Sequence, residues 1–267
     1  MTAQEFREEF NLRYNNALEG APGLDTFEIS SYLTIAQEQY VKMHYDGSKD
    51  VSTAFEYTEK CRRVLSPLVK NIIVDSPMEN LLGTTVTKEN PLNGGMTEYS
   101  SFWQIADDVM YIVAESAIWG GSRVGRGKSS PLTGYNITPI VPVTHDEFHL
   151  SYKNPFRKPS RKKVWRMDSF VQGGKLVVEL IPSIDFPTIQ EYRVRYLSQP
   201  KPIIVESFES ADDTAGLDLS IEGYKAKATC RLNEFTHREI INIAVQNAVL
   251  DYRESNLQGR VQLDSRV

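Results

Sequence analysis

Residues 233–254 read NEFTHREIINIAVQNAVLDYRE, and this stretch decides the fold. Asn233 is a suitable N-cap, because its side-chain oxygen can accept a hydrogen bond from a free amide of the first helical turn. Apolar residues then recur at helical spacing up to about Glu254: Phe235, Ile240, Ile241, Ala244, Val245, Ala248 and Tyr252. Most of the stability of such a helix comes from packing its apolar face. The packing partners therefore have to come from elsewhere in the chain.

Residues 1–71 are expected to supply those partners as three helices. Thr2 and Glu5 stand at the spacing of a capping box, in which hydroxyl and carboxylate satisfy each other's free amides, and Asp25 and Glu28 repeat that spacing. Each pair precedes apolar residues at helical spacing. The apolar positions are Phe6, Phe10, Tyr14 and Leu18 in the first helix, Ile29, Leu33, Ala36, Tyr40 and Val41 in a second that ends near Gly47, and Phe55, Cys61, Leu65 and Leu68 in a third that starts around Ser52 and meets Pro67 near its end.

Residues 72–229 have a different texture, with scattered Pro and Gly between short runs rich in Val, Ile and Tyr. The predicted strands are 108–118, 136–143, 175–181, 191–197 and 202–205. The first run also fits helical spacing, but the preceding Phe102 and Trp103 favour a strand. The predicted fold class is α+β: a helical bundle formed by residues 1–71 and a C-terminal helix within 230–255, with residues 72–229 as a long β-rich insertion.

The last residues, 256–267 (NLQGRVQLDSRV), are predicted to form an extended C-terminal arm. Leu257, Val261 and Leu263 are isolated apolar positions among polar ones, so the segment cannot bury enough surface to fold alone. Two interpretations remain open: an arm that becomes ordered on a partner through these three residues, or a frayed end without a role.

Composition limits the classes of function. Thirty Lys and Arg stand against 35 Asp and Glu, and the formal net charge of −5 argues against a dedicated nucleic-acid binder. No apolar run approaches the roughly 18 residues of a transmembrane helix, and the acidic N-terminus does not resemble a signal peptide. Cys61 and Cys230 are far apart and typical of buried thiols in a reducing compartment. We expect a soluble intracellular protein.

Residues 120–129, GGSRVGRGKS, resemble a phosphate-binding P-loop only in part. Gly127, Lys128 and Ser129 match its end, but Ser122 occupies the position of the required first glycine. The residues that follow, SPLTG, are not typical of the helix that completes such a site. The sequence therefore favours a basic, glycine-rich loop over a nucleotide site.

Residues 145–149, HDEFH, bring two imidazoles and two carboxylates together. His145 and His149 share a face on a helix or a strand, so a metal site is geometrically open, but the motif lacks the glutamate placement of a zinc protease helix. A surface turn with a half-buried strand start is the favoured interpretation. The acidic pairs 107–108 and 212–213 are sequence neighbours that would point to opposite faces of a strand, so they do not predict acid–base catalysis. We expect no catalytic residue, no metal site and no cofactor.

One dense basic run stands out in the chain. It consists of Arg157, Lys158, Arg161, Lys162 and Lys163, with Arg166 just beyond. Pro159 and the flanking Phe156 and Trp165 suggest a loop between strands. Three interpretations remain open: a solvated turn, a contact with an acidic neighbouring subunit, or a contact with DNA phosphates.

Several segments resemble virion structural proteins of crAss-like phages. Residues 31–42 (SYLTIAQEQYVK), 55–65 (FEYTEKCRRVL) and 230–241 (CRLNEFTHREII) resemble three of their helices, and the last is also similar to a segment of tail-adaptor proteins of other short-tailed phages. Residues 154–159 (NPFRKP), 165–166 (WR), 192–197 (YRVRYL) and 200–204 (PKPII) are similar to their middle region. The resemblance covers about residues 25 to 250.

This resemblance implies a non-enzymatic ring protein (tail adaptor) of the head–tail connector below the portal. The implied partners are further copies of the chain in a ring expected to be twelve-fold, the portal protein, adjacent ring or tail proteins, and, as a further candidate, genomic DNA in the exit channel. It also implies a place in the virion after synthesis in the host cytoplasm, without a membrane. The alternatives are another virion tail or cargo protein, and a metal- or nucleotide-dependent enzyme using His145 and His149 or Lys128.

Overall fold

The computed structural model of the chain describes residues 1–18, 22–46, 58–78, 80–81, 84–85, 96–97, 99–119, 137–184, 188–208 and 219–264. The chain forms two compact units. The helical unit combines Met1–Leu68 with Pro200–Val267, and the sheet unit is Val69–Gln199. The helical unit is therefore built from both ends of the chain. The P-loop-like residues 120–129 and the acidic pair 212–213 lie outside the described residues.

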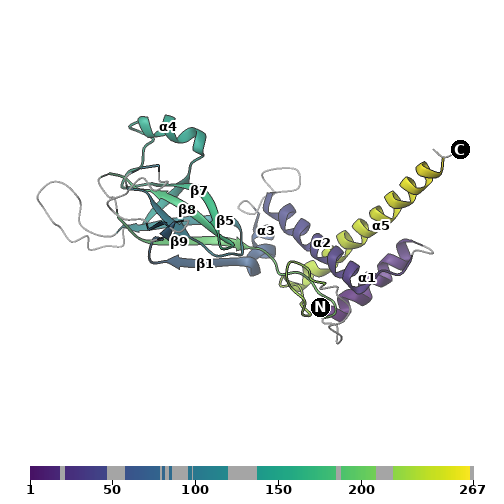
Figure 1. The fold of residues 1–267 in the computed structure, drawn as a ribbon. Helices are drawn as coiled ribbons and strands as arrows, with labels where there is room; N and C mark the ends of the chain where they lie inside the picture. The colour runs from purple at the N-terminus through teal and green to yellow at the C-terminus, as the bar shows by residue number, and fades with distance from the viewer. Residues whose placement is uncertain are drawn as a thin grey trace, which may run out of the picture. The chain divides into compact units, whose positions relative to one another are not determined.

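The helical unit contains α1 (Ala3–Ala17), α2 (Thr26–Asp46), α3 (Glu59–Leu65) and α5 (Glu234–Asp264), and Figure 1 shows α1 and α2 packed along α5. The apolar stripes expected from the sequence form its interior. The buried members are Phe6, Phe10, Tyr14, Ile29, Leu33, Ala36, Tyr40, Val41, Cys61, Leu65, Leu68, Ile240, Ile241, Ala244, Val245 and Ala248. The Tyr40 hydroxyl also donates to Glu239 at 2.9 Å, which joins α2 to α5. The prediction of an α+β fold with N-terminal helices and a C-terminal helix is confirmed.

The helix starts follow the capping signals of the sequence. The Glu5 amide donates to the Thr2 hydroxyl at 3.3 Å, and the Thr2 amide donates to the Glu5 carboxylate at 2.9 Å, so the first capping box is complete. At α2 the Asp25 amide donates to the Glu28 carboxylate at 2.9 Å. The predicted start of the third helix lies outside the described residues; its end passes into the 3-10 helix η2 (Ser66–Leu68) at Pro67.

The C-terminal helix is longer than the sequence pattern predicts. α5 continues to Asp264, so the prediction of an extended arm is wrong for residues 256–264, while residues 265–267 lie outside the described part. The physical reason is cooperativity: once a helix exists, each added residue gains a backbone hydrogen bond without a new nucleation cost. Leu, Gln and Arg are good helix formers, and Gly259 is the residue that most opposes the extension.

Residues 202–205 were predicted as a strand, and that prediction is wrong. They make only an isolated bridge, between Ile204 and Ala228. The backbone instead bonds to polar side chains on the inner face of α2: the amides of Ile203 and Val205 donate to the hydroxyls of Thr34 and Ser30, each at 3.2 Å. Because these hydroxyls satisfy the buried backbone amides, the segment is held without a neighbouring strand.

The sheet unit is one seven-stranded sheet with the order β1-β9-β5-β6-β7-β8-β4, plus a small sheet of β2 (Asn80–Leu81) and β3 (Thr84–Thr85). Four strands confirm predicted runs: β5 (Val109–Trp119), β6 (Ile137–Pro142), β8 (Lys175–Ile181) and β9 (Ile189–Ser198). The other three strands of the large sheet were not predicted: β1 (Val69–Val74), β4 (Ser101–Gln104) and β7 (Val164–Gln172). The short strands β2 and β3 were not predicted either.

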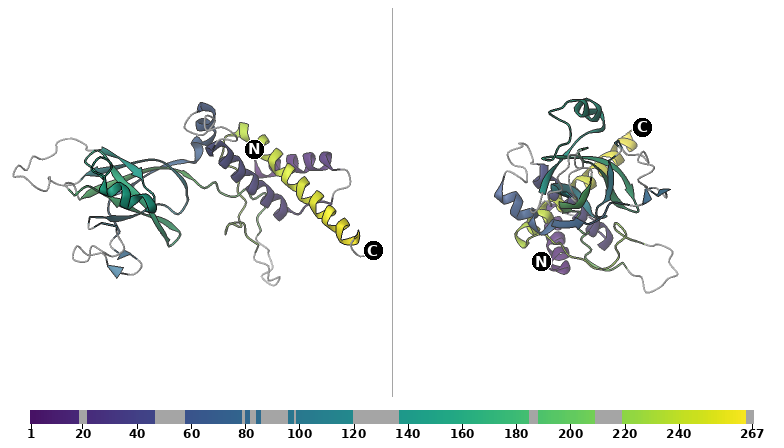
Figure 2. Two further views of the ribbon diagram at one scale, coloured as in Figure 1. Left: turned by 90° about the horizontal axis from the view of Figure 1, so that it is seen from above. Right: turned by 90° about the vertical axis from the view of Figure 1, so that its left-hand side faces the viewer.

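The large sheet curls on itself, as Figures 1 and 2 show. Trp103 on β4 and Tyr192 on β9 come from strands far apart in the sheet order, yet their ring centroids lie 6.0 Å apart. Side chains from β4 to β9 converge on one core, which contains Trp103, Ala117, Trp119, Ile140, Val164, Val178, Leu180, Tyr192, Val194 and Tyr196. The sheet thus encloses its own core.

One pair of strands in the sheet is parallel. β6 and β7 pair through Ile140–Val164, Val141–Trp165 and Pro142–Arg166. Parallel neighbours need a crossover connection, and here it consists of α4 (His145–Lys153) and the basic run that follows. α4 packs Phe148 against Trp165, which lies on the opposite face of β7 from the enclosed core. The basic run therefore lies between a helix and a strand, not between two strands as predicted.

Candidate interaction surfaces

The two histidines considered for catalysis or metal binding lie in a helix of the sheet unit. His145 and His149 lie on the first turns of α4, where a surface turn was predicted; that prediction is wrong. Asp146 and Glu147 in the first turn favour the helix, because its N-terminus carries partial positive charge. Both histidines are exposed, and His145 Nε2 lies 2.9 Å from the carbonyl oxygen of Asp168. Among the described residues, no three His, Cys, Asp or Glu side chains form a group that could hold a metal ion.

Asp107 and Asp108 lie in the turn before β5, not in a strand. The Asp108 carboxylate pairs with Lys70 and accepts a hydrogen bond from the Tyr196 hydroxyl at 2.9 Å. Burial acts to raise the pKa of Asp108, but the bonds from Lys70 and Tyr196 outweigh it, so the pKa is lowered. The Asp108 carboxylate thus connects the turn before β5 to β1 and β9.

The basic loop, residues 154–163, has a defined shape. The Asn154 carbonyl accepts the amides of Arg157 and Lys158 at 3.1 and 3.0 Å. Ser160 and Lys163 exchange backbone hydrogen bonds of 3.0 and 3.1 Å. The carbonyl of Arg161 accepts from the Thr138 hydroxyl at 3.0 Å, which ties the loop to β6. Backbone bonds therefore fix the loop before any partner arrives.

The side chains of the basic loop point largely to solvent. Arg157, Lys158, Arg161 and Lys162 are exposed and Lys163 is half-buried. Phe156 is 92% exposed, the highest value among the exposed large hydrophobic side chains of the described residues. Aromatic and arginine side chains are enriched at protein interfaces, so an exposed ring among five cations makes this loop a candidate binding surface.

Arg166 is placed differently from the rest of the predicted basic group. Its side chain is only 12% exposed and pairs with Glu115, which is 4% exposed, on the core-facing side of the sheet. Arg166 Nε also lies 3.2 Å from Asp168, and the Tyr192 hydroxyl donates to Glu115 at 2.8 Å. In this arrangement Arg166 neutralises an internal carboxylate, and the basic loop proper presents the other five cations.

Burial and the neighbouring charges together set the pKa values of the side chains in this internal cluster. Burial raises the pKa of the Glu115 carboxyl, and Arg166 and the Tyr192 hydroxyl counteract it. Burial alone would lower the pKa of Arg166, but the Glu115 carboxylate outweighs it and the pKa lies above its ordinary value. Because a guanidinium does not lose its proton in proteins, the cluster keeps a buried positive charge beside Glu115.

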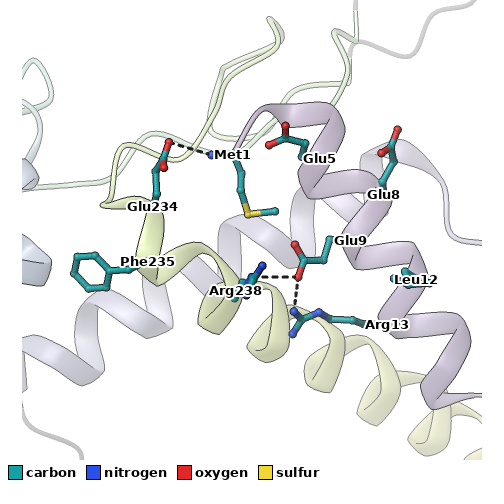
Figure 3. Close-up of a pocket in the computed structure, with 9 residues that line it drawn as sticks. All are labelled: Met1, Glu5, Glu8, Glu9, Leu12, Arg13, Glu234, Phe235 and Arg238. Atoms are coloured by element: carbon teal, nitrogen blue, oxygen red, sulfur yellow. Dashed lines mark hydrogen bonds and ion pairs between the residues drawn. The ribbon is translucent and has the colours of Figure 1, made fainter.

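The helical unit carries an acidic groove between α1 and the start of α5, shown in Figure 3. Its volume is about 960 Å³, and the α1–α5 groove is lined by Met1, Glu5, Glu8, Glu9, Leu12, Arg13, Glu234, Phe235 and Arg238. Glu9 pairs with Arg13 and lies 3.9 Å from Arg238. The carboxylates of Glu5, Glu8 and Glu234 are exposed at its edge. Sequence reasoning missed this groove.

Phe235 was predicted on the apolar face of the C-terminal helix, yet its side chain is 56% exposed. It lines both the α1–α5 groove and a second hollow of about 520 Å³ beside Glu59, Lys60 and Arg63 of α3. A signal for this was present in the sequence: the spacing of five residues to Ile240 takes Phe235 off the 3.6-residue stripe. Phe235 therefore offers an aromatic contact at the surface.

The three residues predicted as arm contacts, Leu257, Val261 and Leu263, lie in the last turns of α5.

None of the helices in the described part of the chain is both long and apolar enough to cross a membrane. A preformed cationic loop on one unit and a groove edged by carboxylates on the other are features of a protein that binds other macromolecules through its surfaces. Such surfaces are expected of an assembly subunit, a class of protein whose function lies in contacts with other proteins.

Comparison with known proteins identifies the family. Residues 1–258 match the family model for phage tail ring protein 3/4, so the chain belongs to that family. It is 31% identical to "Ring protein 3" of Bacteroides phage crAss001 over 252 residues, which cover 94% of this chain and 96% of that protein. It is 28% identical to "Ring protein 4/5" of the same phage over 269 residues, covering 100% and 99% of the two chains. The predicted identity as a ring protein of a crAss-like phage is confirmed, which makes the chain a structural component of the virion.

Proposed function

We propose that this protein forms a ring in the head–tail connector of a short-tailed phage, below the portal. In this role it is non-enzymatic, contributes to tail attachment and surrounds the channel through which DNA leaves the head. The single observation that carries the proposal is the match to two ring proteins over almost the whole chain. A match of that extent covers the helical unit and the sheet unit alike, so both belong to the ring protein.

The proposed partners are further copies of the chain, the portal protein and adjacent ring or tail proteins. A twelve-fold ring is the expected assembly. Closed rings bury surface between subunits on two sides of every copy, so binding surfaces rather than pockets should carry the function. The basic loop and the α1–α5 groove are the two surfaces with the chemistry for such contacts.

The end of α5 is proposed as a further contact with the portal or an adjacent subunit. Leu257 and Val261 are four residues apart and share one face of a helix, so the segment can dock as an amphipathic helix rather than as an extended arm. The basic loop is proposed to face either a neighbouring subunit or the DNA in the channel.

The test is direct imaging of the purified full chain mixed with its portal. We expect a stoichiometric complex in which this protein forms one closed ring of twelve copies, visible by electron microscopy and by native mass measurement. A mixture in which the two proteins stay apart, or a complex that contains this chain without a ring, would contradict the proposal.

A further inference from the structure

We propose that the basic loop of one copy docks in the α1–α5 groove of the next copy around the ring. The inference rests on the proposed ring function. In a closed ring every copy meets its neighbour head to tail, so two different and complementary patches must be present on the same chain. The described residues contain such a pair, one on each unit.

The loop supplies cations on a rigid support. Every ionisable side chain in residues 154–163 is Arg or Lys. Its backbone bonds at Asn154, at Ser160 with Lys163, and from Thr138 to Arg161 hold it in one shape. Because this order exists before binding, docking loses less conformational entropy than it would for a mobile segment.

The groove supplies matching anions. Glu9 is already paired with Arg13, and the Glu234 carboxylate lies 3.8 Å from the amino-terminal ammonium of Met1. The exposed carboxylates of Glu5 and Glu8 form no such ion pair with the described residues that line the groove and keep further acceptor positions, as Glu234 does beside its ion pair. The Glu5 carboxylate accepts a hydrogen bond from the Thr2 backbone amide at 2.9 Å, and the Glu8 carboxylate accepts one from the Gln4 side-chain amide at 2.9 Å. Neither bond involves a cationic side chain, so both carboxylates keep their full charge for an incoming Arg or Lys.

Apolar contact complements the charges. The loop presents Phe156, which is 92% exposed, and the groove presents Phe235 and Leu12, which are 56% and 63% exposed. Aromatic side chains that fill a hollow ringed by polar groups dominate the energetics of many interfaces. A groove of about 960 Å³ has room for a phenylalanine ring with one or two flanking cations.

This pairing explains the exposed Phe156 better than contact with DNA phosphates does. Phosphates would use only the five cations and would leave the aromatic ring without a partner. The α1–α5 groove offers carboxylates for the cations and apolar side chains for the aromatic ring, and both belong to the same chain. Contact with DNA is therefore kept as an outcome of the experiment.

The experiment reverses charge on each side separately. The loop variant is Lys158→Glu with Lys162→Glu, and the groove variant is Glu8→Lys with Glu234→Lys; all four side chains are exposed. Control variants are Lys175→Glu and Asp75→Lys, which change the charge of exposed positions outside the basic loop, the α1–α5 groove and α4. Each is assembled under the conditions in which the wild-type ring forms, and ring content is measured by native mass spectrometry.

Each double variant alone should lower the apparent association by on the order of tenfold or more, because like charges then face each other at every interface. An equal mixture of the two should recover assembly. In the mixture the two reversed positions of the loop meet the two reversed positions of the groove, and the unchanged loop meets the unchanged groove. The charges at these positions are therefore opposite again at every interface. Recovered rings should contain the two variants alternately, in equal number. The controls should assemble as the wild type does.

The outcomes separate the two proposals. If the wild type forms rings and both double variants do so equally well, the loop–groove contact is wrong and the ring function stands. If the loop variant forms rings but retains less DNA, the loop faces DNA instead. A folded double variant, checked by circular dichroism, that is not rescued by its counterpart also overturns the contact. Failure of the wild type to form any ring overturns the proposed function itself.

Discussion

Replacing Arg166 with Met tests whether the buried ion pair inside the sheet unit is structural. Met provides an unbranched apolar side chain in place of Arg, and the substitution removes the positive charge beside Glu115, which is 4% exposed. The orphaned carboxylate then has the Tyr192 hydroxyl as its remaining partner within the cluster. Breaking a buried pair in this way is strongly destabilising, because one charge stays buried without compensation.

The loss of stability cannot exceed the free energy needed to protonate Glu115, because the buried carboxyl can bind a proton instead of staying charged. From an ordinary glutamate pKa of 4.5, neutralising the carboxyl at pH 7 costs about 3 kcal/mol, at roughly 1.4 kcal/mol per pH unit. We therefore expect Arg166→Met to lower the free energy of unfolding by about 3 kcal/mol at pH 7 and by less than about 1 kcal/mol at pH 5. The sign follows from linkage: the variant raises the folded pKa of Glu115, so stability is lost as pH rises.

Tryptophan fluorescence provides the assay. All three tryptophans of the chain, Trp103, Trp119 and Trp165, are buried in the sheet unit, so urea unfolding followed by their emission reports on that unit. The matched control is Glu115→Gln combined with Arg166→Met, which removes both charges and should restore most of the stability at both pH values. A destabilisation that is equal at pH 5 and pH 7, or that persists in the double variant, would refute the reasoning.

Three further outcomes are expected. Burial raises the pKa of Glu179, so wild-type stability should fall as pH rises from 4.5 toward that pKa; Glu179→Gln should reduce this slope by fluorescence, whereas the exposed control Glu147→Gln should not. Replacing His145 and His149 with Ala should leave metal content and particle assembly unchanged, and loss of a stoichiometric metal by elemental analysis would contradict this. Deleting residues 256–267 should leave thermal melting of the chain nearly unchanged and weaken ring or portal attachment; full incorporation into particles would contradict a docking role.

The sequence predicts the helical unit well because its signals are local. The capping pair Thr2 and Glu5 and the four-residue spacing of Phe6, Phe10 and Tyr14 are sufficient to place α1 and its buried face. The α4 helix was missed although comparable signals were present: acidic residues in the first turn, and Phe148 and Tyr152 four residues apart, with stacked rings in the structure. The periodic signal is weak because α4 has nine residues and Phe148 is its one buried side chain.

The remaining differences depend on contacts that no local pattern contains. Residues 202–205 have the composition of a strand, but Ser30 and Thr34 of α2 satisfy the backbone in place of a strand partner. Those hydroxyls are more than a hundred residues away in the sequence. The acidic groove could not be predicted from a local pattern either, because its edge combines Glu5 and Glu8 of α1 with Glu234 of α5.

The ends of the sheet unit explain how one chain can carry both surfaces. The unit begins with β1 at Val69 and ends after β9 at Gln199, and these two strands are antiparallel neighbours in which Val69 pairs with Leu197. The entry and exit of the sheet unit therefore lie side by side. The helices that precede and follow the unit can then come together without the entropic cost of closing a long flexible loop. The helical unit can then form its core and groove from distant parts of the chain, while the sheet unit presents the basic loop. A head-to-tail ring requires two complementary patches on every copy, and the pair proposed above lies on two different units.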